Sequence, residues 1–141
     1  ASCLGACYRC IQRYGNRTYH GLLDWRLGLG FLRLLYDPKY KCGLDGNFRY
    51  IELENWHDQV EESLINVNML KPSIYSPPKL REINGLNLWS IENIKNGKKY
   101  FVIHPFWSKI YMEKFLGLSI DSADSKLINS FEVLHMPQNI F

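Results

Sequence analysis

The stretch Leu86-Asn-Leu-Trp-Ser-Ile-Glu-Asn-Ile-Lys-Asn-Gly-Lys-Lys-Tyr-Phe-Val-Ile103 decides the fold of this chain. Residues 86–91 alternate between apolar and polar side chains, which indicates a strand with one buried face. Asn96-Gly97 favours a type I′ hairpin turn, and residues 99–103 have the apolar character of a returning strand. The stretch therefore predicts an antiparallel hairpin, the start of a small, mainly antiparallel sheet.

Helices and a loop are predicted on either side of this hairpin in the sequence. An amphipathic helix over 55–68 is indicated by four apolar residues at helical spacing, Trp56, Val60, Leu64 and Val67. The proline-containing residues 71–81 are expected to form a loop. The remaining expected elements are helices over 108–116 and 123–129 and a strand over 131–134. Together they predict an α+β fold.

A further helix is predicted over residues 21–36, before the Asp37-Pro38 stop signal. Leucine and other apolar residues surround it almost completely, so it is expected to be buried by its neighbours. We therefore expect residues 1–36 to form a cysteine-containing loop and a buried helix. Residues 37–141 are expected to form a small α+β part packed on them, all within one domain.

Length and composition fit a single globular domain. The 141 residues are 46% hydrophobic and 14% aromatic, with a net charge of +3. No run approaches the ~18 apolar residues of a membrane span, and no apolar core of a signal peptide precedes residue 20. These features predict a cytoplasmic protein without a membrane partner. Because the sequence begins beside a cysteine and without Met, we expect a C-terminal fragment of a larger protein.

Three cysteines lie close together at the start of the chain. Cys7-x-x-Cys10 has the ligand spacing of a zinc knuckle, and Cys3 lies four positions before Cys7. A structural Zn²⁺ needs a fourth ligand, for which His20 and Cys42 are the candidates. The shorter loop favours His20, while Cys42 would complete a four-cysteine site.

The same cysteines have two alternative roles, in redox chemistry and in disulfides. A Cys-x-x-Cys pair can be a redox couple, and four cysteines can form two disulfides in a secreted protein. A third nearby cysteine and the absence of an export signal favour zinc over both. A catalytic zinc usually keeps an open position beside a carboxylate base, and no His-x-Glu or His-Glu-x-x-His motif is present.

The positive charge is concentrated near the cysteines. Residues 1–33 contain one acid, Asp24, and five arginines: Arg9, Arg13, Arg17, Arg26 and Arg33. The first three alternate with tyrosines, among them Tyr14, and arginine with aromatic rings is the combination that binds single-stranded nucleic acid. Alternatively, the tyrosines pack around the zinc loop and the arginines are solvated. The candidate nucleic-acid contacts are Arg9, Arg13, Arg17 and Tyr14.

Four segments together resemble a known family. They are Ala6-Cys-Tyr-Arg-Cys-Ile11, Leu22-Leu-Asp-Trp-Arg26, Val102-Ile-His-Pro-Phe-Trp107 and Phe131-Glu-Val-Leu134. They resemble the MrfA-type zinc-binding, cysteine-rich domain near the C-terminal end of bacterial DEAD/DEAH-box helicases of superfamily two. This domain also occurs in DISARM-like phage-defence proteins. One departure is His135-Met136, which stands where the family commonly has basic residues.

The resemblance implies a zinc-stabilised, non-catalytic accessory module that assists DNA binding and holds domains or partners together. Its expected partners are DNA, single-stranded DNA included, and a helicase motor domain or subunit. This chain has neither a Gly-x-x-x-x-Gly-Lys-Ser/Thr loop nor an Asp-Glu-x-His box. ATP hydrolysis is therefore expected only of the parent or partner protein.

Two alternative functions remain open from the sequence. The order of elements resembles the core of restriction-endonuclease-like nucleases, which hold Mg²⁺ with several acidic side chains. Residues 99–104 contain no acid, and Glu92 alone is insufficient, so such a domain would be degenerate. The other alternative is a protein–protein adaptor without nucleic-acid contact.

Overall fold

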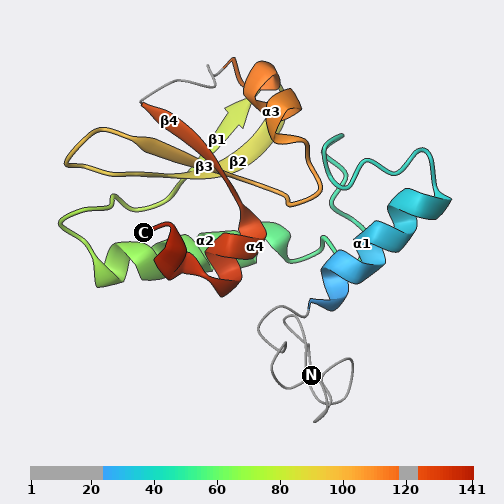
Figure 1. Cartoon of the computed structure of the whole chain (residues 1–141), viewed down its shortest axis with the longest axis horizontal. Coiled ribbons are helices and arrows are strands. Elements are labelled where there is room, and N and C mark those ends of the chain that lie inside the picture. Colours follow the sequence, from blue (N-terminus) through green and yellow to red (C-terminus); the bar gives the residue numbers. More distant parts are fainter. Residues whose placement is uncertain (1–23, 118–123) are drawn as a thin grey trace, which may run out of the picture.

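The chain forms a four-stranded sheet with helices on both sides (Figure 1). The computed structural model describes residues 24–117 and 124–141. The strands are β1 (Lys79–Ile83), β2 (Leu86–Glu92), β3 (Lys99–Ile103) and β4 (Ser125–Asn129). The helices are α1 (Trp25–Tyr36), α2 (Trp56–Leu70), α3 (Lys109–Phe115), α4 (Ser130–His135) and a 3₁₀ helix (Pro137–Asn139). Within these residues no helix is long and apolar enough to cross a bilayer.

The sheet has the strand order β1-β2-β3-β4. β2 pairs antiparallel with both β1 and β3, whereas β4 pairs parallel with β3. The sheet is mixed, with antiparallel pairing in the majority, and the predicted α+β class is confirmed. In Figure 1, α2 and α4 lie together along one side of the sheet and α3 lies toward the other.

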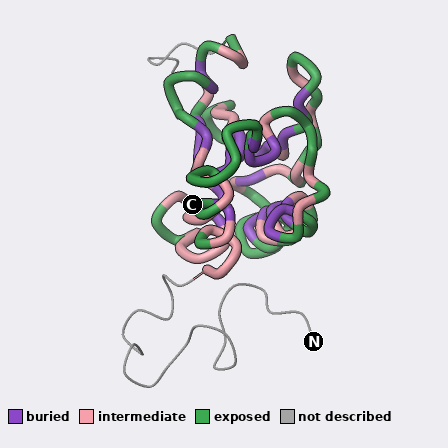
Figure 2. Tube along the Cα trace, turned by 90° about the vertical axis from the view of Figure 1, so that its right-hand side faces the viewer, coloured by how far each residue is buried: buried purple, intermediate pink, exposed green. Residues whose placement is uncertain are grey.

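Helix α2 and strands β2 and β3 supply much of the core. The four apolar residues that predicted α2 are its four buried residues, Trp56, Val60, Leu64 and Val67. Every residue of β3 after Lys99 is buried, as expected for an interior strand covered on both faces. Figure 2 shows the buried positions concentrated in the middle of the described body. The predicted helix over 55–68 and strands over 86–91 and 99–103 are therefore confirmed.

The tight hairpin turn lies one strand earlier than predicted. Asn84 and Gly85 have φ of +51° and +83° and join β1 to β2, with Ile83 opposite Leu86. Two central residues with positive φ are what a type I′ turn requires. At Asn96-Gly97 only the glycine has positive φ, and a six-residue connection joins β2 to β3. The type I′ prediction at 96–97 was therefore wrong.

Strand β1 occupies the end of the segment predicted as a loop. The prediction of a loop over 71–81 is wrong from Lys79 onward, because residues 79–83 pair with β2. Pro77 and Pro78 directly precede the strand, at the edge of the sheet. Proline lacks the N–H that a central strand needs, so it is tolerated just before an edge strand.

The last two predicted elements have their types exchanged. Residues 125–129 form β4 rather than a helix, because they pair with β3 along its whole length. Residues 130–135 form α4 rather than a strand. Asn129 Oδ1 accepts the N–H of Glu132 at 2.9 Å, and Asn129 Nδ2 donates to Glu132 Oε1 at 3.2 Å. These bonds cap the helix N-terminus and explain why it begins there.

Helix α1 is present but is not the buried helix that its composition predicts. Its N-cap is Asp24, whose Oδ1 accepts the Arg26 N–H at 3.0 Å. Gly30 is its one buried residue. The five large apolar side chains of its second half are 39–84% exposed: Phe31, Leu32, Leu34, Leu35 and Tyr36. The described body supplies few side chains against this helix, so its apolar surface remains uncovered there. The expected burial of residues 21–36 is corrected for residues 25–36.

Candidate functional site

Most of the predicted site residues lie outside the described part of the chain. These are the ligand candidates Cys3, Cys7, Cys10 and His20 and the nucleic-acid candidates Arg9, Arg13, Arg17 and Tyr14. The structure therefore leaves the zinc site and the arginine contacts as predictions. The alternative fourth ligand, Cys42, lies within the described residues, and so does Asp24, the N-cap residue of α1.

Cys42 is a free, buried cysteine in the loop between α1 and α2. Its backbone has φ of +52°, a conformation that non-glycine residues seldom adopt. The Cys42 carbonyl accepts a hydrogen bond from the indole of Trp107 at 2.8 Å, which fixes the strained residue against the segment after β3. The thiol therefore points into the core rather than toward solvent.

The Cys42 thiol has two polar neighbours among the described residues, the Tyr40 hydroxyl and the His104 ring. Cys42 Sγ lies 3.4 Å from His104 Nδ1 and 3.6 Å from Nε2. His104 is 5% exposed, and its Nδ1 accepts the N–H of Phe106 at 3.1 Å. From that bond we assign the proton of the neutral ring to Nε2. The sequence interpretation of His104 as a hydrogen-bonded structural residue agrees with these contacts.

Cys42 and His104 are both uncharged at neutral pH. Burial raises the pKa of the Cys42 thiol to about 11, and the charge of Glu52 acts in the same direction. Burial lowers the pKa of His104 to about 4, against an opposing effect of Asp24. A nucleophilic cysteine needs a thiolate, usually beside an imidazolium. This pair has the opposite protonation pattern and is suited to packing.

A buried carboxylate lies next to this pair. Glu52 has a 1% exposed side chain, and its Oε1 accepts the Tyr40 hydroxyl at 2.8 Å. Arg33 Nε of α1 lies 2.6 Å from Glu52 Oε1, and the two groups form an ion pair. The N–H is not aligned for a hydrogen bond. Glu52 Oε2 has no hydrogen-bond partner among the described residues. Tyr40, Cys42, Glu52 and His104 form a buried polar group that we call the Cys42 cluster.

The Cys42 cluster borders a cavity that is too small for a substrate. Glu52 and His104 line this cavity together with Asp24, and its volume is about 20 Å³. Small-molecule sites usually have volumes of about 300–1,000 Å³. The space is therefore that of roughly one water molecule. The cluster joins α1 to the body, and its other two members, Tyr40 and Cys42, lie in the lining of an open groove of about 640 Å³.

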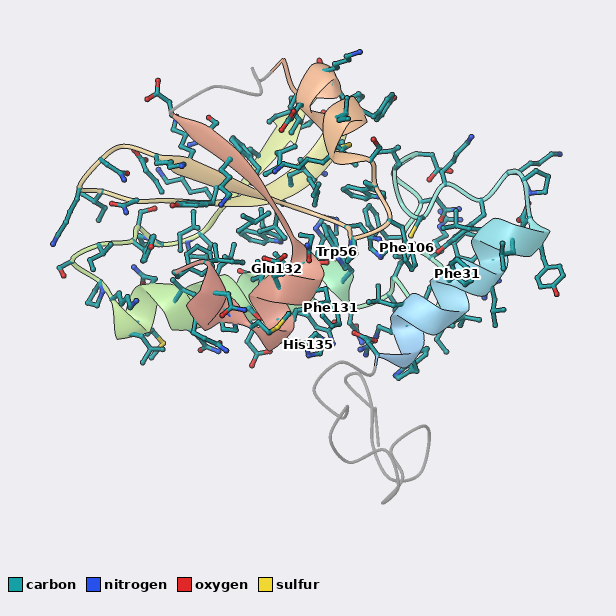
Figure 3. All side chains as sticks on the ribbon, viewed as in Figure 1. Phe31, Trp56, Phe106, Phe131, Glu132 and His135 are labelled. Atoms are coloured by element: carbon teal, nitrogen blue, oxygen red, sulfur yellow. The ribbon has the colours of Figure 1, made fainter. Side chains whose placement is uncertain are left out.

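The start of α1 is tied to the other end of the chain. Asp24 Oδ2 lies 3.2 Å from His135 Nε2 of α4, although 111 positions separate the two residues. Figure 3 shows His135 on α4, on the side toward the start of α1. His135 thus has a structural partner at the position where the resembled family commonly has basic residues. Asp24 both caps α1 and anchors it.

A second group of contacts joins the middle of α1 to the segment after β3. Phe31 and Phe106 have ring centroids 6.4 Å apart, and they lie beside each other in Figure 3. A Cβ placed on Gly30 would lie 3.3 Å from the Phe106 ring, so glycine permits this close approach. Arg33 also lies over the Tyr50 ring at 4.8 Å. Helix α1 is therefore attached through Asp24, Arg33 and the Phe31–Phe106 contact, and the large apolar side chains of its C-terminal half are exposed.

The described residues contain no group of three His, Cys, Asp or Glu side chains that could hold a metal ion. Strand β3, where a restriction-endonuclease-like site would need acids, contains Lys99, Tyr100, Phe101, Val102 and Ile103. Nothing in the geometry of residues 24–117 and 124–141 favours the nuclease alternative.

Sequence reasoning missed the pairing of Arg33 with Glu52 and that of Cys42 with His104. The one available signal was the position of Glu52 between Ile51 and Leu53, since a carboxylate in an apolar stretch needs a partner when buried. That signal does not identify the partner, because 19 and 62 positions separate the paired residues.

Comparison with known proteins adds no relative. No family model, curated protein or solved structure matches this chain.

Proposed function

We propose that this chain is a non-catalytic, zinc-stabilised accessory module of a DEAD/DEAH-type helicase or phage-defence protein in the bacterial cytoplasm. It helps to bind DNA and to hold a motor domain or subunit. The proposal starts from the cysteine spacing and the family resemblance. The described structure supports it through the way in which α1 is attached.

The anchored start of α1 is the observation that carries the proposal. Residues 1–23 contain the predicted zinc ligands, and they are followed immediately by Asp24. Asp24 is fixed by the N-cap bond to Arg26 and by His135. A zinc loop that ends at His20 would be followed by this anchored residue only four positions later. Such a loop could transmit binding of nucleic acid to the rest of the module.

The environment of Cys42 favours His20 as the fourth ligand. Cys42 is 2% exposed, and its carbonyl is held by the indole of Trp107 at 2.8 Å. Cys42 is also packed against His104 within the core. Cys3, Cys7, Cys10 and His20 together have the donor set of a structural zinc site. Zinc there would contribute folding free energy and no reaction step.

Metal analysis of four proteins tests this assignment. The wild-type chain purified without chelator is expected to contain about one zinc. Replacement of Cys7 by Ser or of His20 by Asn should lower both the zinc content of the purified chain and its affinity for zinc. The variant Cys42→Ala is the matched control and should retain zinc. Loss of zinc in Cys42→Ala with retention in His20→Asn would establish a four-cysteine site instead.

Salt-dependent binding to single-stranded DNA tests the nucleic-acid role. Replacement of Arg9, Arg13 and Arg17 by Ala removes three cations, so the slope of log K against log salt should become shallower by about 2. A control triple variant replaces the exposed lysines Lys79, Lys95 and Lys126 of the sheet region. An unchanged slope in the arginine variant would exclude Arg9, Arg13 and Arg17 as phosphate contacts.

A protein–protein adaptor is the second candidate function. The observation that favours it is the exposed apolar surface of α1, which has no use in phosphate recognition. The two functions are separated by the DNA experiment, because an adaptor without nucleic-acid contact would show no salt-dependent DNA affinity.

A further inference from the structure

Helix α1 turns its charged side toward the body of its own chain. Arg26, Gly30 and Arg33 follow one another at helical spacing and lie on one side of the helix. Gly30 is buried next to the Phe106 ring, and Arg33 pairs with Glu52. Arg26 lines the small cavity that Glu52 also borders. A surface helix ordinarily has the reverse arrangement, with its apolar side toward the core and its charges toward solvent.

The other side of α1 is apolar and largely uncovered by the described residues. Gly28, Leu32 and Leu35 lie four and three positions apart, so they share one face of the helix. Phe31 and Tyr36 flank this face. Leu32 and Leu35 are 50% and 62% exposed, and Phe31 and Tyr36 are 53% and 84% exposed. We call these five residues the outer face of α1, and none of them is charged.

Gly28 has no packing role within the described body. Glycine in a helix interior is destabilising relative to alanine, and a close contact can compensate for that cost. A Cβ on Gly30 would lie 3.3 Å from the Phe106 ring, whereas a Cβ on Gly28 would meet no described atom within 4 Å. A second helix packed on the outer face would give Gly28 the role that Gly30 has against Phe106.

The outer face has the area that a small symmetric dimer needs. Its four large side chains expose roughly 500 Å² of the 150–250 Å² that each has when fully exposed. Two copies packed through this face would bury about 1,000 Å² in total, which is the lower limit for a specific interface. In Figure 1, α1 lies at the edge of the described body and away from the sheet, so a second copy has access to it.

Charge favours a second copy over other occupants. The outer face has no cation for the phosphates of a nucleic acid and no charge that would select an acidic or a basic partner. An uncharged face meets its own copy without like-charge repulsion, because Arg26 and Arg33 lie on the other side of the helix. A two-fold dimer uses the same patch on both copies and is the commonest symmetric assembly.

We propose that the outer face of α1 packs against the outer face of α1 in a second copy of this chain, forming a two-fold dimer. Leu32 and Leu35 are buried between the two helices, and Gly28 lets their backbones approach closely. This dimer goes beyond the function proposed above. Its test requires neither zinc nor DNA, so failure of the dimer is distinguishable from failure of that function.

Sedimentation equilibrium of the full chain measures the association. A reductant is present, so that disulfides between copies do not contribute. An interface at the low end of the specific range is expected to give a monomer–dimer equilibrium with a dissociation constant of about 10 μM.

Variants locate the dimer interface. The double variant Leu32→Glu and Leu35→Glu should raise the dissociation constant by at least about tenfold, because it replaces central apolar contacts with like charges. The matched control is Ile65→Glu with Met69→Glu, which changes two apolar residues of α2 that are 39% and 71% exposed. The control should leave the dissociation constant unchanged. Far-UV circular dichroism checks that each variant is folded, as expected for exposed positions.

Four results would overturn the inference. A wild-type chain that stays monomeric at about 100 μM would show that no second copy binds. A dimer that persists unchanged in Leu32→Glu with Leu35→Glu would lie on another surface. Equal dissociation in the α2 control would reflect added charge rather than the outer face. A monomer that binds phosphatidylcholine vesicles through Leu32 and Leu35 would assign the outer face to a membrane.

Discussion

Protonation of His104 is expected to destabilise the fold, and the variant His104→Asn isolates this effect. His104 is 5% exposed, and its Nδ1 accepts the N–H of Phe106. An asparagine Oδ1 takes a position close to that of Nδ1 and can accept the same hydrogen bond, but asparagine does not titrate. The variant loses ring contacts with Trp56 and Trp107 at every pH, so its absolute stability should fall.

The magnitude follows from the two pKa values of the histidine. Burial lowers the pKa of His104 to about 4 in the folded chain, whereas an unfolded histidine has a pKa of about 6.5. The folded state therefore resists protonation, and the stabilising effect of the neutral ring is complete above pH 6.5. It is lost as the pH falls toward 4. The difference corresponds to about 3 kcal/mol in the free energy of unfolding.

Urea unfolding of both proteins between pH 4 and pH 7 measures this effect. Carboxylates also titrate in this range, so the informative quantity is the difference between the two proteins at each pH. The stability of the wild type should fall by about 3 kcal/mol more than that of His104→Asn. Parallel pH profiles would refute the reasoning, as would an NMR titration of His104 with a midpoint near 6.5.

Two further predictions concern the ion pair that attaches α1 to the body and two glycines, one in α1 and one in the β1–β2 turn. Arg33→Met should lower the free energy of unfolding by about 2–3 kcal/mol, because it leaves the Glu52 carboxylate buried without its cation. Glu52→Gln should lower it by only about 1 kcal/mol, since Arg33 is 36% exposed and can be hydrated; equal losses would contradict this asymmetry. Gly28→Ala should raise stability by up to about 1 kcal/mol, because an added Cβ has open space in the interior of α1. Gly85→Ala should lower it by about 1 kcal/mol, because φ there is +83°, and the same sign for both glycine variants in thermal unfolding would be inconsistent with the structure.

The elements that could be predicted are those whose local pattern and tertiary role agree. The apolar spacing of α2 matches its buried face, and the apolar residues of β3 match an interior strand. Those patterns arise because burial dominates the choice of residue at these positions. They predict the element without identifying which strands it will pair with.

The two errors near the C-terminus have different causes, one local and present in the sequence, the other tertiary. Asn129 and Glu132 have the spacing of a capping box, and this signal marks the start of α4. Residues 125–129 are a strand through pairing with β3, a tertiary contact that outweighs their weak local preference. Asn84-Gly85 has the same turn signal as Asn96-Gly97, and both of its residues have positive φ. The signal was missed because residues 71–81 were expected to form a loop, which left no strand in front of Asn84 for a hairpin turn.

The candidate site was less predictable than the fold. Its buried polar contacts join residues far apart in the chain, such as Asp24 with His135 and Cys42 with His104. No periodicity reports such pairs. The exposure of α1 was also missed, because an apolar helix has the same sequence pattern whether its own chain or a partner covers it.

Zinc content tests the central claim most directly. The chain should be expressed in medium with zinc, purified without chelator and analysed by inductively coupled plasma mass spectrometry with a protein concentration from amino-acid analysis. The account predicts about one zinc per wild-type chain, its retention in Cys42→Ala and its loss in Cys7→Ser. Wild-type protein that is folded and free of zinc would contradict it.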